Sequence, residues 1–134
     1  MRTIVTGAAR GIGRAIAERL AHDAHQRGET PRLVLVDQLG DELATVAAHL
    51  QTHFNAEVQV ITGQMANVQL PTVVAEAAAQ WGGLDGLVSN AGYAQPGDLV
   101  SFELADWDQM FAVNVRAQAG TVPANCRHSR RLWT

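Results

Sequence analysis

A glycine-rich turn near the N-terminus is the feature that most constrains this chain. The turn covers residues 6–13 (TGAARGIG) and follows a short β-rich run at residues 2–6. After it, Ile12, Ile16 and Leu20 recur every four residues, which predicts a helix with one apolar stripe. We therefore expect a strand, a tight glycine turn and a helix in direct succession, as in nucleotide-binding α/β units.

The three glycines of this turn have separable roles. Gly7 allows a sharp turn off the strand with positive φ, and Gly13 lets the helix pack close to the strand. The missing side chain at Gly11 leaves room for a pyrophosphate, to which the helix N-terminus offers unpaired N–H groups and partial positive charge. Arg10 and Ile12 stand between these glycines and join the candidate cofactor-binding residues. An ordinary tight turn between strand and helix is the alternative explanation.

The rest of the chain alternates apolar runs with amphipathic segments. Strands are expected near residues 2–6, 33–36, 58–61 and 84–88, and helices from residue 12, over 39–50 and 71–81, and from about residue 106. Short apolar strands separated by helices predict a parallel sheet with right-handed crossovers. We expect an incomplete Rossmann-type αβα fold over residues 1–120, with strand order 3-2-1-4, and an irregular tail over residues 121–134.

An acidic residue, Asp37, ends the second expected strand. A carboxylate at this place accepts hydrogen bonds from both ribose hydroxyls of an adenosine and repels a 2′-phosphate, which favours NAD over NADP. Arg10 in the glycine turn is compatible with a 2′-phosphate, so NADP stays open. A solvated Asp37 that caps the next helix is the alternative without a ligand.

With these features in order, residues 1 to about 120 resemble the short-chain dehydrogenase/reductase family. The glycine spacing of the turn, with Thr6 in front, is similar to the family pattern. Residues 89–92 (SNAG) match the family's Asn-Asn-Ala-Gly with Ser in the first place. The resemblance implies that Asn90, Ala91 and Gly92 flank the cofactor and steady the central sheet.

Two further positions follow from the same resemblance. Asn67 and Val68 stand where the family usually has Asp-Val, a pair that contacts the adenine. Asn114 resembles the family's helix asparagine, which implies a catalytic role as the outer residue that holds a water in a proton relay. Without that role, Asn114 would be a helix residue bonded to a neighbouring loop.

The resemblance implies an NAD(P)-dependent oxidoreductase that moves a hydride between nicotinamide and an alcohol or ketone. The family's catalytic Ser, Tyr and Lys would all follow Asn114, yet the sequence contains no lysine and one tyrosine, Tyr93. We expect an inactive cofactor-binding half from a truncated or frame-shifted coding sequence. A non-enzymatic NAD-binding or interaction module is the alternative, and an S-adenosylmethionine-binding domain does not require Asn90 or Asn114.

Composition excludes several other classes of protein. Hydrophobic residues make up 47% and charged residues 17% of the chain, which is typical of a folded domain. The net charge of -3 gives no basic field for nucleic acid, and no apolar run approaches the roughly 20 residues of a membrane span. The single cysteine, Cys126, fits a reducing compartment, so we expect a cytoplasmic protein. His49 and His53 are interpreted as solvated positions, and no metal site is expected.

The open edge of the fourth strand should make the chain prone to association and marginally stable as a monomer.

We also predict that the purified chain does not oxidise an alcohol with NAD, because the tyrosine and lysine that exchange the proton are missing. Absorbance of reduced nicotinamide reports the reaction. Turnover above a protein-free control would contradict this prediction.

Overall fold

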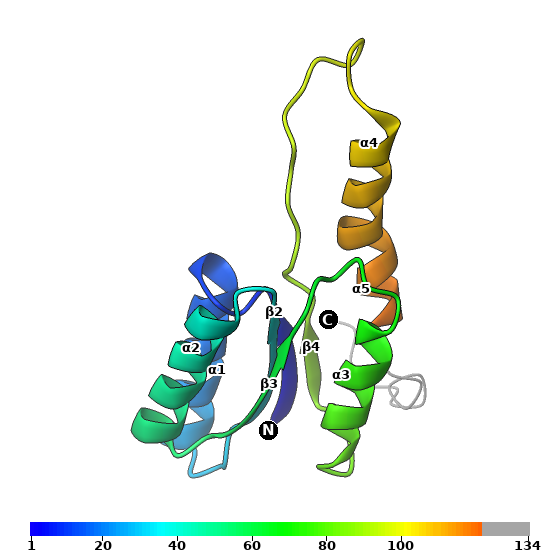
Figure 1. The fold of residues 1–134 in the computed structure, drawn as a ribbon. Helices are drawn as coiled ribbons and strands as arrows, with labels where there is room; N and C mark the ends of the chain where they lie inside the picture. The colour runs from blue at the N-terminus through cyan, green and yellow to red at the C-terminus, as the bar shows by residue number, and fades with distance from the viewer. Residues whose placement is uncertain (122–134) are drawn as a thin grey trace.

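The fold is a four-stranded parallel sheet covered by helices on both faces (Figure 1). The computed structural model describes residues 1–121. Its strands follow the spatial order β3-β2-β1-β4, which confirms the predicted order and the α/β class. The bounds are β1 (Arg2–Thr6), β2 (Arg32–Asp37), β3 (Glu57–Thr62) and β4 (Gly86–Val88).

Three helices form the outer layers, and a helical arm follows them. Figure 1 shows α1 (Gly11–Gln26) and α2 (Gly40–Phe54) on one face of the sheet and α3 (Leu70–Ala79) on the other. The arm consists of α4, a π-helical segment η1, and α5. Figure 1 shows α4 and the loop before it projecting beyond the carboxyl end of the sheet, whereas α5 contacts α3. The arm's bounds are Leu104–Phe111, Ala112–Arg116 and Ala117–Gly120.

Alternate residues of the two central strands face two separate cores. The core under α1 and α2 contains Val5, Leu33 and Leu35. The core under α3 contains Ile4, Val34 and Val36. Because both faces of β2 are covered, its interior residues form a continuous apolar run, as predicted for a buried parallel strand.

The buried face of α1 is not the apolar stripe that stands out in its sequence. Ile12 is 73% exposed, and Ile16 and Leu20 are only half-buried. The predicted helix is present, but its apolar stripe is not its packed face. Small side chains take that face because α1 lies close against the sheet; the buried residues are Gly13, Ala17, Ala21 and Ala24.

The helical arm also differs from expectation. It begins at Leu104, slightly before the predicted start near residue 106, and α4 buries none of its residues. Its apolar stripe faces outward, with Trp107 at 47%, Phe111 at 51% and Val115 at 55% exposure. Among the described residues β4 pairs with β1 alone, so β4 forms the open edge that the sequence predicts.

The predicted irregular tail falls almost entirely outside the described residues. Thr121 is its one described member; the side chain is buried, and its hydroxyl lies 2.9 Å from the Ala117 carbonyl oxygen. Within residues 1–121, no helix combines the length and the apolar character needed to cross a membrane. In the same range, no three His, Cys, Asp or Glu side chains gather as ligands for a metal ion.

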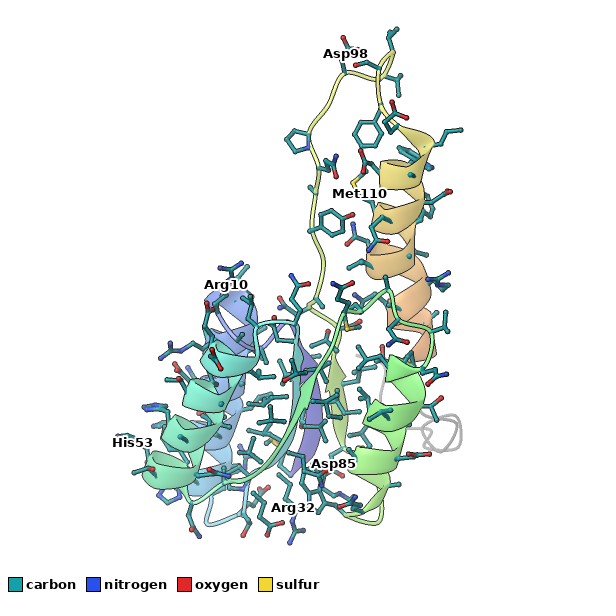
Figure 2. The ribbon with its side chains drawn as sticks, in the orientation of Figure 1. Arg10, Arg32, His53, Asp85, Asp98 and Met110 are labelled. Carbon is teal, nitrogen blue, oxygen red and sulfur yellow. The ribbon has the colours of Figure 1, made fainter. Side chains whose placement is uncertain are left out.

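An ion pair joins the first residue of β1 to the residue before β4. The Arg2 guanidinium donates to both carboxylate oxygens of Asp85, at 2.7 and 3.2 Å, and the Arg2 backbone N–H also donates to Asp85 at 2.8 Å. The hydrogen bonds from Arg2 lower the pKa of Asp85. Figure 2 shows Asp85 at the opposite end of the strands from Arg10, so this ion pair holds the edge strand β4 far from the glycine turn.

We predict that Asp85→Asn lowers the free energy of unfolding at pH 7 by about 0.5–1 kcal/mol, the range of partly exposed pairs. The stabilisation is present above the unfolded-state pKa of about 4 and disappears as the pH falls through the lower folded-state pKa. Urea unfolding of both proteins at pH 7 and pH 3 measures the difference, which should shrink at pH 3. An equal difference at the two pH values would rule out the ion pair as its source.

Candidate functional site

A cavity of about 690 Å³ opens where the carboxyl ends of the strands meet. This volume lies in the range of about 300–1,000 Å³ that is typical of small-molecule sites. In parallel α/β sheets, ligands bind at the carboxyl ends of the strands, at the point where neighbouring strands are followed by helices on opposite faces of the sheet. The sequence-predicted residues that line the cavity are Gly7, Arg10, Gly11, Ile12, Asp37, Asn90, Ala91 and Gly92.

The glycine turn has the backbone conformation that the sequence predicts. Gly7 and Gly11 adopt φ values of 66° and 57°, which L side chains rarely tolerate. A Cβ at Gly11 would meet no atom within 4 Å, so the turn is open toward the cavity. A Cβ at Gly13 would overlap the carbonyl oxygen of Gly7. Two glycines therefore shape the turn, and the third allows the helix to pack against it.

The N-terminus of α1 is free of competing polar side chains. Its N-cap residue, Arg10, makes no side-chain hydrogen bond to the helix, and the first turn contains no acidic residue. Gly11 and Ile12, the first two helical residues, line the cavity. The unpaired N–H groups and the positive end of the helix dipole at this point suit an anion such as a phosphate.

Asp37 connects the glycine turn to the start of α2. One carboxylate oxygen accepts the N–H of Ala9 at 3.0 Å, and the other accepts the N–H of Leu39 at 3.1 Å. Each oxygen keeps a lone pair for a further donor. Asp37 therefore supports the turn through its own contacts and can still accept a hydrogen bond from a ligand in the cavity.

A buried threonine and Asn90 join the ends of β1 and β4. The Thr6 hydroxyl accepts the backbone N–H groups of Asn90 and Ala91, both at 3.0 Å. The Asn90 amide donates to the carbonyl oxygens of Thr6 at 3.1 Å and Gly7 at 3.3 Å. In the sequence, Thr6 stands out only as part of a family pattern, although a Thr directly before a glycine turn is a candidate for such a role.

Asn114 lies outside the lining of the cavity but contacts the segment that forms one of its walls. Its side-chain oxygen accepts the N–H of Tyr93 at 3.0 Å, and its amide donates to the carbonyl oxygen of Tyr93 at 2.8 Å. Asn114 belongs to η1, and π-helical turns are frequent near functional sites. The structure thus shows the loop contact for this side chain.

The structure brings Asn67 and Val68 near the site without placing them in it. Neither residue lines the cavity; Val68 is 71% exposed, and the Asn67 side chain accepts the N–H of Gln69. Their contact with a cofactor stays a prediction. Eight further residues line the cavity without having been predicted. Five of them directly follow β2 or β3, where the strand-end rule could have found them; the eight are Gln38, Leu39, Gly63, Gln64, Met65, Tyr93, Gln109 and Val113.

The family model that matches this chain is that of the short chain dehydrogenases, over residues 2–128. The chain belongs to this family. A glucose 1-dehydrogenase of Gluconobacter oxydans is 34% identical over 133 residues, covering 98% of this chain and 46% of the relative. A short-chain dehydrogenase/reductase of Hericium erinaceus is also 34% identical, with 84% and 44% covered. The chain thus spans about half the length of the curated relatives it matches.

Solved structures of this family superpose on the chain. A short chain dehydrogenase from Burkholderia cenocepacia in complex with NADP gives a TM-score of 0.82 at 33% identity, covering 95% of this chain and 50% of the other. The L-sorbose reductase of Gluconobacter frateurii, complexed with NADPH and L-sorbose, gives 0.79 at 28% identity, with 89% and 43% covered. The short-chain dehydrogenase fold therefore extends across the described sheet and helices.

We predict that Gly13→Ala lowers the free energy of unfolding by more than about 2 kcal/mol, because the new methyl group overlaps backbone that cannot move aside easily. Gly28→Ala is the matched control; Gly28 has φ of 73° and open space around it. Backbone strain alone should cost that control about 1 kcal/mol. Urea unfolding compares the two variants, and a smaller loss for Gly13→Ala than for Gly28→Ala would contradict the close packing.

Proposed function

We propose that the cavity binds a nicotinamide dinucleotide and that the chain is the cofactor-binding part of an oxidoreductase. The reaction is hydride transfer between nicotinamide and a small-molecule alcohol or ketone. The observation that carries this proposal is the open glycine turn, in which Gly11 leaves the uncapped N-terminus of α1 accessible from the cavity. Membership of the short chain dehydrogenase family supports the reaction class.

The residues present fit the cofactor part by part. The N–H groups at Gly11 and Ile12 would hold the pyrophosphate, since no acidic side chain competes there. Asp37 and its neighbours after β2 would hold the adenosine ribose, and the segment from Asn90 to Tyr93 would flank the nicotinamide half. A bound nicotinamide supplies the hydride acceptor or donor, while the chain orients it and shields it from water.

Two residues act in opposite directions on the choice between NAD and NADP. Asp37 retains a lone pair on each oxygen for the ribose hydroxyls and repels a 2′-phosphate, which favours NAD. Arg10 lines the same cavity and can pair with a 2′-phosphate. The solved relatives from Burkholderia, Gluconobacter and Thermococcus sibiricus were crystallised with NADP, NADPH and 5-hydroxy-NADP, which favours use of NADP(H) through Arg10.

The family resemblance implies that catalysis uses a Ser, a Tyr and a Lys that follow Asn114. The chain has no lysine, and its single tyrosine, Tyr93, belongs to the loop held by Asn114. We therefore propose that Asn114 contributes to the reaction indirectly, by orienting the segment beside the nicotinamide. One N–H and one lone pair of its amide remain free for the water that the family resemblance implies.

Sugars are candidate substrates, because relatives include a glucose dehydrogenase and a sorbose reductase.

Calorimetric titration with NADH, NADPH and S-adenosylmethionine tests the proposal on the purified chain. We expect both nicotinamide cofactors to bind and S-adenosylmethionine not to bind. Arg10→Ala should weaken the binding of NADPH by about tenfold or more and leave the affinity for NADH nearly unchanged. The reason is that it removes a charge-assisted hydrogen bond to the 2′-phosphate, which only NADPH carries. Asp37→Ala should do the reverse, weakening NADH and shifting the preference toward NADPH.

The matched control is Arg14→Ala. Arg14 lies on α1 one turn after Arg10, pairs with Glu18 at 2.8 Å, and does not line the cavity. It should leave both affinities unchanged, which separates a local contact from the general charge of the chain. If the folded wild-type chain binds neither nicotinamide cofactor, the proposed function is wrong.

A further inference from the structure

Gln118 on α5 connects two walls of the cavity without lining it. Its amide nitrogen donates to the carbonyl oxygen of Ala91 and, at 3.2 Å, to that of Val113. Its amide oxygen accepts the hydroxyl of Ser89. Ala91 and Val113 both line the cavity, one from the end of β4 and the other from η1. One half-buried side chain therefore joins the strand end to the helix across the site.

Gln118 also bonds to the π-helical turn that precedes it. The N–H of Ala117 bonds to the carbonyl oxygen of Ala112, five residues earlier, in place of the α-helical partner Val113. The Val113 carbonyl oxygen then accepts the Gln118 amide. Gln118 thus supplies a donor to the turn that carries Asn114.

Asn114 and Gln118 form two successive contacts of one kind. They stand four residues apart in the helical arm, and their partners, Tyr93 and Ala91, are two residues apart in one segment. The arm therefore holds this segment at two points.

We propose that Gln118 is a positioning residue that, together with Asn114, sets the distance between the strand-end wall and the helix wall of the cofactor cavity. The role rests on the proposed function, because its consequence is tighter binding of the dinucleotide. Ser89 belongs to the same arrangement: its short side chain replaces the family's usual Asn in the SNAG segment and meets the amide oxygen of Gln118. The device is thus a Ser–Gln pair that depends on both residues.

Amide hydrogen exchange of the full chain, followed by NMR, tests the positioning step without any cofactor. Gln118→Met keeps the length of the side chain and removes its donors and acceptor. We expect the Tyr93 N–H, which donates to Asn114, to exchange about tenfold faster, while amides of β2 stay unchanged. Gln51→Met is the control, because Gln51 is an exposed glutamine of α2 remote from the cavity residues.

An unchanged Tyr93 exchange rate in Gln118→Met would overturn the proposal. If that variant unfolds, Ser89→Ala provides the second test, because it removes a single contact of Gln118. In this variant the Tyr93 amide should also exchange faster, by a smaller factor than in Gln118→Met. An unchanged exchange rate would again overturn the proposal.

Titration with NADPH then separates positioning from general stability. Gln118→Met should raise the dissociation constant about tenfold, equivalent to about 1.4 kcal/mol, at an unchanged urea midpoint. Faster exchange with unchanged affinity would show that the segment does not shape the cavity, and would overturn the proposal. If the wild-type chain binds neither NADPH nor NADH, the proposed function fails, while the exchange measurements alone decide the role of Gln118.

Discussion

The backbones of α1 and β1 approach each other so closely at Gly13 that no side chain fits between them. A Cβ there would overlap the carbonyl oxygen of Gly7 and lie 2.6 Å from the Asn90 amide nitrogen. Three elements therefore meet at this point: the end of β1, the start of α1 and the end of β4. The alanines on the buried face of α1 and the exposure of Ile12 follow from the same closeness, because bulky residues would push the helix off the sheet.

Around this contact, polar side chains hold the strand ends that surround the cavity. The Thr6 hydroxyl and the Asn90 amide tie β4 to β1, and Asp37 ties the glycine turn to α2. Asn114 and Gln118 extend the same principle to the helical arm. Each of these side chains bonds to backbone groups in the segments that surround the cavity, so side-chain hydrogen bonds connect the walls of the cavity to one another.

The pattern of apolar residues in the sequence was sufficient to predict the sheet, but it does not identify the buried face of α1. The apolar runs predicted all four strands and their order, since buried parallel strands have few other arrangements. The apolar stripe led by Ile12 is not the buried face of α1, because periodicity records hydrophobicity and not how closely two backbones approach. The apolar stripe of α4, which includes Trp107, is exposed in a chain that spans about half the length of its relatives.

The sequence by itself determined the fold class, the family and half of the residues that line the cavity, because glycines, strand-end polar residues and their order are local features. Only the tertiary structure decided how those residues are used. It showed that both oxygens of Asp37 already bind backbone N–H groups and that Asn114 holds Tyr93. It also showed that Gln118 spans two walls. The contacts of Asp37 with Ala9, of Asn114 with Tyr93 and of Gln118 with Ala91 join residues far apart in the chain. A spacing pattern does not reveal which distant backbone group a side chain will meet.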